Sequence, residues 1–172
     1  MMTQTTTQAW NTEITRLTTA YPKFKARLYT DSRVWGWFKK HILKWAAATT
    51  VGYTVYFDAS QYGTNRGAET LKHEGAHIAD WKRWNVLMTF SYIFLLPAVF
   101  TMRAYWEWQG YKETLRSVHD EYKMTSASYY AYVTDYYCQF VADEFAGPNY
   151  LWMFPFRNYM YKKCQRFIST LS

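Results

Sequence analysis

Apolar residues recur at helical spacing along most of the chain, and one early segment follows a different pattern. The helical repeats predict helices over about 10–21, 32–48, 68–84, 101–118 and 126–146, and from about 155 onward. Pro22 ends the first of these, and Gly147 with Pro148 ends the fifth. Between them Val51–Phe57 reads V-G-Y-T-V-Y-F, a β-branched and aromatic run that predicts a strand. The pattern therefore predicts an α+β fold, rich in helix, with a small early β-sheet.

The polar positions give no sign of a boundary between domains. No Pro-, Gly- or Ser-rich linker interrupts the pattern, and no internal repeat is present. With 172 residues the chain is long enough to bury one core. We expect a single domain over 1–172, made of N-terminal helices (1–49), a central part (50–112) and aromatic C-terminal helices (113–172).

One apolar run is nearly long enough to be a transmembrane helix. Arg83 and Arg103 are separated by 19 uncharged residues, with an apolar centre from 86 to 102. A spanning helix needs roughly 20 mostly apolar residues, and here Pro97 would break the helix late in the span. A buried helix that ends near Leu96 is the favoured interpretation, with a transmembrane helix as the alternative. The N-terminus lacks a basic segment followed by an apolar one, so we expect no signal peptide.

Composition narrows the class of protein. Charged residues make up only 19% of the chain, which excludes a disordered one, and two cysteines cannot form a disulfide framework. The aromatic content is 22%, and the net charge of +7 permits an anionic partner. No helix-turn-helix, RNP or zinc-finger pattern accompanies that charge, so we expect no nucleic acid as partner.

Residues 73–77 read His-Glu-Gly-Ala-His, which is an H-E-x-x-H motif. On a helix His73 and His77 stand one turn apart on one face, so both imidazoles can reach one Zn²⁺ ion. Glu74 lies about 100° round the helix and can hold the metal-bound water without binding the metal. Zinc lowers the pKa of that water towards about 7, and Glu74 accepts its proton as general base. The alternative is two surface histidines beside an ordinary glutamate.

A catalytic zinc site needs a third protein ligand. Asp80 and Arg83 stand where the metzincin pattern requires glycine and histidine, which excludes a metzincin. Glu107 is the better candidate, because it lies 30 residues after His77 on a predicted helix. The alternative for Glu107 is a surface acid paired with Arg103.

Several residues could support such a site. Arg103 and Tyr111 share a helix face with Glu107, where Arg103 could orient the carboxylate and Tyr111 could point its phenol at the metal. Asp80 and Asp143 are weaker candidates as partners of a ligand histidine, and solvated surface acids are the favoured interpretation of both. His119 could stabilise an oxyanion, although a surface histidine at a helix end is favoured.

The membrane and zinc hypotheses exclude each other. A helix that spanned a bilayer over 84–102 would place His77 and Glu107 on opposite sides of a core roughly 30 Å thick. Evidence for the zinc site is therefore evidence against a span, unless the segment is re-entrant.

The order of these features resembles a minimal zincin of the gluzincin type. The resemblance lies in the strand Tyr53–Phe57, the HEGAH helix, an apolar stretch that ends in Pro97, and a helix reading R-x-x-x-E-x-x-G-Y. The chain is also similar to small, uncharacterised bacterial and phage-encoded metallopeptidases. The resemblance covers roughly 50–112, with a looser match at 149–156. It implies zinc on His73, His77 and Glu107 with Glu74 as base, although no N-E-x-x-S-D helix follows.

The expected function is that of a zinc-dependent hydrolase, a metallopeptidase whose activated water attacks an amide carbonyl of a peptide or protein substrate. We expect the strand at 51–57 to pair with an extended substrate. The alternative is a structural or assembly protein, such as a phage virion component or homo-oligomer, that retains the scaffold and uses its aromatic surface as an interface. The expected location is cytoplasmic or virion-associated, and a membrane-associated protein is a further alternative.

Overall fold

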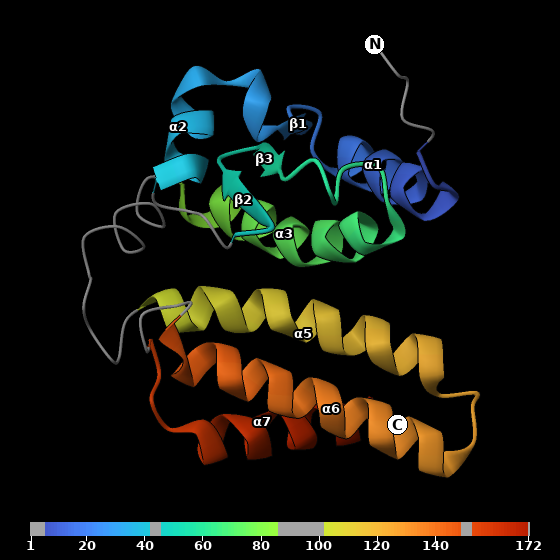
Figure 1. The fold of residues 1–172 in the computed structure, drawn as a ribbon. Coiled ribbons are helices and arrows are strands. Elements are labelled where there is room, and N and C mark those ends of the chain that lie inside the picture. The colour runs from blue at the N-terminus through green and yellow to red at the C-terminus, as the bar shows by residue number, and fades with distance from the viewer. Residues whose placement is uncertain (1–5, 42–45, 86–101, 149–152, 172) are drawn as a thin grey trace. The chain divides into compact units, whose positions relative to one another are not determined.

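The computed structural model describes residues 6–41, 46–85, 102–148 and 153–171. These residues form two compact units, 1–85 and 86–172, and each unit is described by itself. Helices dominate both units, and the first unit adds a three-stranded sheet (Figure 1). This confirms the helix-rich α+β class in its coarse form, while the expectation of one domain over 1–172 stays a prediction.

The described residues of the first unit form three helices, a short 3-10 turn and the sheet. Its elements are α1 (Gln8–Ala20), β1 (Lys25–Leu28), η1 (Tyr29–Asp31), α2 (Arg33–His41), β2 (Ala48–Val51), β3 (Thr54–Phe57) and α3 (Asn65–Trp84). The strand order is β1-β3-β2, in which β3 pairs parallel with β1 and antiparallel with β2. The central strand is therefore β3, and β2 lies at one edge of the sheet.

The prediction of one strand over 51–57 is wrong. The segment contains a tight turn after Val51, where Gly52 has a positive φ of 64°, and the chain reverses there to form a hairpin. A glycine takes that φ at no steric cost, which is why the turn falls at this position. Most of the predicted strand is therefore the central strand β3, and β2 is one of the two edge strands of the described sheet.

The prediction of a helix over 32–48 is wrong at its C-terminal end. The structure describes α2 only to His41, residues 42–45 lie outside the described residues, and Ala48 already begins β2. The helix cannot extend to Ala48 because Ala48 pairs with Phe57 in the sheet. This pairing is not visible in the helical repeat of the sequence. The strand β1 was not predicted either.

The two faces of the sheet pack against different elements. Along β3 the buried Val55 and Phe57 face α1 and α3, and the Phe57 ring lies 5.1 Å from that of Trp10. Tyr56 points to the opposite face, where its ring stacks on those of Tyr29 and Trp35. In Figure 1 the sheet accordingly lies between α2 and α3. This alternation places β2 beside the helix that carries the HEGAH motif.

The N-terminus of α3 is anchored by a side-chain cap and a close approach. The Thr64 hydroxyl accepts a hydrogen bond from the Gly67 backbone N–H at 3.0 Å, as an N-cap residue does. A Cβ atom on Gly67 would lie 2.0 Å from the Gln61 carbonyl oxygen, so only glycine fits there. The helix prediction for 68–84 is confirmed, with a start three residues earlier.

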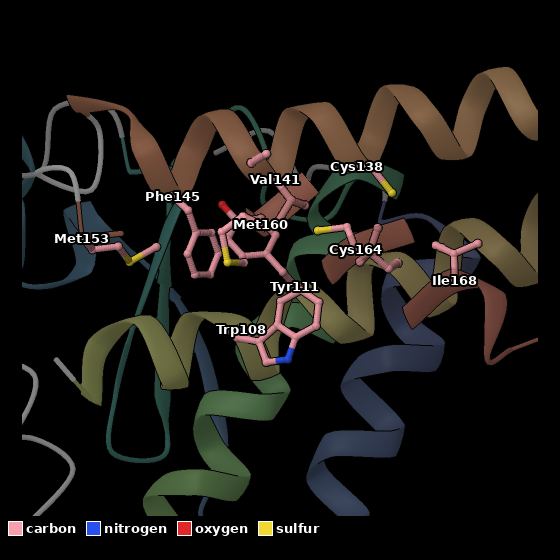
Figure 2. Packing of buried hydrophobic residues seen from close by; sticks show 11 residues of the cluster. Trp108, Tyr111, Cys138, Val141, Phe145, Met153, Met160, Cys164 and Ile168 are labelled. Atoms are coloured by element: carbon pink, nitrogen blue, oxygen red, sulfur yellow. The ribbon is translucent and has the colours of Figure 1, made fainter. Parts of the chain in front are cut away.

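The second unit is a helical bundle. Its described residues form α5 (Met102–Tyr122), α6 (Ala127–Ala146) and α7 (Arg157–Ser169), which confirms the helices predicted in these ranges apart from small shifts of their ends. The side chain of Ser126 caps α6 by accepting a hydrogen bond from the Tyr129 N–H. All three helices contribute to one core, in which the Tyr111 ring packs 5.6 Å from that of Phe145 (Figure 2).

The buried helix predicted to end near Leu96, within the apolar run at 86–102, lies outside the described residues, which resume at Met102 with α5. Among the helices in the described ranges, none is long and apolar enough to cross a bilayer.

Candidate metal and hydrolytic site

The two histidines of the motif lie on one face of α3. Their ring centroids are 5.1 Å apart with the ring planes at 74°, as the spacing of one helical turn predicts. His77 is buried and His73 is half-buried. Two imidazoles at this separation form a donor pair of the type that holds zinc, and the pair therefore fits the metal that the sequence predicts.

The glycine inside the motif has a packing role. A Cβ atom on Gly75 would meet a methyl carbon of Leu17 at 3.1 Å and a guanidinium nitrogen of Arg16 at 3.2 Å, both on α1. The side of α3 that carries Gly75 therefore lies close to α1. This contact, together with the cap at Thr64, fixes the helix that presents the histidines.

Glu74 is buried beside the sheet, at 8% exposed, and is held by a neighbouring strand. The hydroxyl of Thr50 on β2 donates a hydrogen bond to the Glu74 Oε2 atom. Thr50 is paired with Val55, and directly paired residues of an antiparallel ladder point to the same face, so Thr50 faces α3. The predicted general base is thus positioned by the edge strand.

The opposite face of β2 carries a second hydroxyl contact. Tyr29 donates a hydrogen bond from its phenol to the Thr49 hydroxyl at 2.6 Å. Burial raises the pKa of Tyr29 well above its ordinary value, and the negative charges of Glu74 and Asp58 add to the increase. Tyr29 therefore remains a protonated hydrogen-bond donor at neutral pH and ties β2 to η1.

Glu107 lies on α5 in the second unit and is 2% exposed. A carboxylate buried to this extent is costly unless a cation or hydrogen-bond donors compensate its charge. This burial disagrees with the alternative of an exposed surface acid. Arg103 lies one turn earlier on α5, and the Tyr111 ring packs into the core of the second unit. Roles of Arg103 and Tyr111 at a metal stay predictions.

The weaker candidates fall into two groups. Asp143 forms an exposed ion pair with Arg157, which agrees with a solvated surface acid, and Asp80 is half-buried on α3. His119 is not the surface histidine that the sequence favoured, because it is 8% exposed and a hydrogen bond of 2.7 Å joins its Nδ1 atom to the Tyr130 hydroxyl. Tyr130 follows on the next helix, too far along the chain for the sequence to reveal the pairing.

Two residues at the site carry no recognisable signal in the sequence. Thr50 and Tyr29 are common residue types outside any motif, and their contacts follow from strand pairing. The alternation of charged and apolar side chains in Lys25–Leu28 was a signal for β1, although four residues make it a weak one.

Comparisons with protein-family models, with curated proteins and with solved structures gave no match.

Proposed function

We propose that the chain is a zinc-dependent hydrolase with a zincin-like site, and that it cleaves peptide bonds. The observation that carries the proposal is the arrangement on α3. The imidazoles of His73 and His77 share one face of the helix, and the buried carboxylate of Glu74 accepts a hydrogen bond from Thr50. His73 and His77 would hold the metal, with Glu107 as the third ligand. Zinc, when bound, would supply a positive charge that lowers the pKa of a water molecule.

Glu74 would act as the general base. Its carboxylate lies on the same helix as the histidines but about 100° away round the axis, so it is free of the ligand role. Oε2 accepts the Thr50 hydrogen bond, and among the described residues no side chain is seen to donate to Oε1. That oxygen would accept the proton of the attacking water and pass it to the leaving amine.

The edge strand β2 would bind the substrate. Among the described residues β2 pairs only with β3, and an extended peptide can add to the other side of such an edge strand through backbone hydrogen bonds. This revises the expectation that the segment 51–57 lines the cleft, since β3 is paired on both sides. A peptide on β2 would run close to Glu74 because Thr50 belongs to that strand.

The test is hydrolysis of a quenched-fluorescent peptide library by zinc-loaded protein. We expect cleavage by the wild type and a loss of about 100-fold or more in Glu74→Gln, because general bases contribute rate factors of that size. Glu74→Gln should still bind zinc, since Glu74 is not a ligand. Equal cleavage by both proteins would contradict the role of Glu74.

A matched control is Glu69→Gln on the same helix. Glu69 forms an ion pair with Lys72 at 2.9 Å and lies more than one turn before the motif. The same change of charge there should leave cleavage near the wild-type rate. A similar loss in Glu69→Gln would point to a general effect on α3.

A second candidate function is assembly into a homo-oligomer, and an aromatic stripe favours it. Along α6 the rings of Tyr129, Tyr132, Tyr136 and Phe140 are 49%, 69%, 58% and 41% exposed. Their spacing of three and four residues places them on one helix face, and tyrosine is enriched at protein interfaces. Light scattering tests this candidate: a defined oligomer that Tyr132→Lys and Tyr136→Lys dissociate supports it, and a monomer contradicts it.

A further inference from the structure

We propose that Thr50 is a positioning residue, which holds the Glu74 carboxylate in the orientation that the general base requires. The inference rests on the proposed function and adds a residue from a different element to the site. Thr50 lies outside the H-E-x-x-H motif, 24 residues before Glu74, and its hydroxyl donates to the Oε2 atom.

The register of the sheet explains why Thr50 reaches Glu74. Thr50 is opposite Val55, whose side chain is fully buried in the core shared by β3, α1 and α3. Side chains that are directly paired point to the same face, so the Thr50 hydroxyl is directed at α3. A shift of one residue would place Thr49 there instead, with Thr50 turned to the face of Tyr29.

The contact restricts a side chain that would otherwise be mobile. Glutamate has three rotatable side-chain bonds, and a partly buried hydrogen bond to one carboxylate oxygen selects among their rotamers. With Oε2 bound to Thr50, Oε1 is the oxygen left to receive a proton. Small displacements of a catalytic group reduce rate steeply, by about 100-fold for about 1 Å.

Thr50 also links Glu74 to β2, the strand on which the peptide would bind. The backbone of β2 would pair with the peptide, while the side chain of Thr50 holds Glu74. A change confined to that side chain should therefore reduce kcat and leave KM unchanged, since the backbone that binds the peptide is kept.

The experiment compares three variants in zinc-loaded form on the quenched-fluorescent peptide library. Thr50→Val keeps the shape of the side chain and its β propensity but lacks the donor, and we expect kcat to fall about 10- to 100-fold. Thr50→Ser restores the hydroxyl and should recover most of the activity. Thr70→Val is the matched control, since it removes a 2.7 Å hydrogen bond to Gln61 one turn before Glu74. Its kcat should stay near that of the wild type.

A second measurement does not depend on activity. In metal-free protein, urea unfolding of Thr50→Val, Glu74→Leu and the double variant gives a thermodynamic cycle, since leucine, unlike glutamine, has no oxygen that could accept the Thr50 hydrogen bond. We expect the double variant to be less destabilised than the sum of the single ones, by roughly tenfold in the unfolding equilibrium constant, because each single change already breaks the contact. Zinc affinity should be the same in Thr50→Val and wild type.

The outcomes separate this inference from the proposed function. Additive effects in the cycle, or wild-type kcat in Thr50→Val while Glu74→Gln is inactive, would overturn the role of Thr50 alone. A wild-type protein that binds zinc but cleaves no peptide would overturn the proposed function, and with it any catalytic role of Thr50.

Discussion

Gly67 at the start of α3 lies against the backbone of Gln61, and a Cβ atom on Gly67 would stand 2.0 Å from the Gln61 carbonyl oxygen. The same Cβ would also lie 2.9 Å from the Trp10 ring. The chain therefore enters α3 through a contact that no other residue type permits. Because α3 carries both histidines of the motif, this contact helps to fix where they stand.

Gly67→Ala should destabilise the protein by about 3 kcal/mol, because the backbone at Gln61 must move to admit the methyl group. Urea unfolding measures the change. Gly75→Ala on the same helix is the control. Its Cβ would meet the side-chain ends of Leu17 and Arg16, which can shift, and alanine favours helix by about 1 kcal/mol over glycine. Equal losses in the two variants would contradict the steric explanation.

The long helices α3 and α6 could be predicted from the sequence because their signals are local, whereas the end of α2 was predicted wrongly. Thr64 and Ser126 cap α3 and α6, and the apolar repeat behind each cap continues to the end of the helix. The sheet could not be predicted in the same way. Gly52 divides what reads as one strand, and β1 exists because it pairs with β3. That pairing joins segments almost 30 residues apart and leaves little trace in four residues of sequence.

Tyr130→Phe should destabilise the protein by about 1–3 kcal/mol. The change removes the hydroxyl that shares a 2.7 Å hydrogen bond with His119, and it leaves a buried imidazole nitrogen without that partner. Tyr129→Phe is the control, because that ring is 49% exposed and surface changes cost within about 0.5 kcal/mol. Thermal or urea unfolding distinguishes the two. A stable Tyr130→Phe would mean that water replaces the hydroxyl.

Asp58→Asn should destabilise the protein at neutral pH and much less in acid. The Ser60 backbone N–H, at 3.2 Å, and the Lys39 ammonium, at 3.0 Å, bind the Asp58 carboxylate and lower its pKa below the ordinary 3.8. A carboxyl with a lowered pKa in the folded state contributes stability above its unfolded pKa, and this contribution is lost as pH falls through the folded value.

The measurement is urea unfolding of Asp58→Asn and wild type at about pH 6 and again at about pH 2.5. The difference in unfolding free energy between the two proteins should shrink on going to the lower pH. A difference that stays constant would show that the Asp58 charge has no part in stability.

Some residues of the candidate site could be predicted from local sequence, as the long helices could, and others depend on strand pairing. His73, Glu74 and His77 could be predicted as a group because one helical turn relates them, and α3 places the two rings as that spacing requires. Thr50 reaches Glu74 through the register of β2 on β3, which depends on the whole first unit. Glu107 is buried on α5, and its role as a ligand stays a prediction.

The most direct test of the zinc site is titration of metal-free protein with Zn²⁺, read by calorimetry and by the metal content after dialysis. Wild type and Glu74→Gln should each bind one zinc ion per chain. His73→Ala, His77→Ala and Glu107→Ala should each weaken binding by about 100-fold or more, because each removes a ligand. A wild-type chain that binds no zinc would contradict the site, and unchanged affinity in Glu107→Ala would remove Glu107 from it.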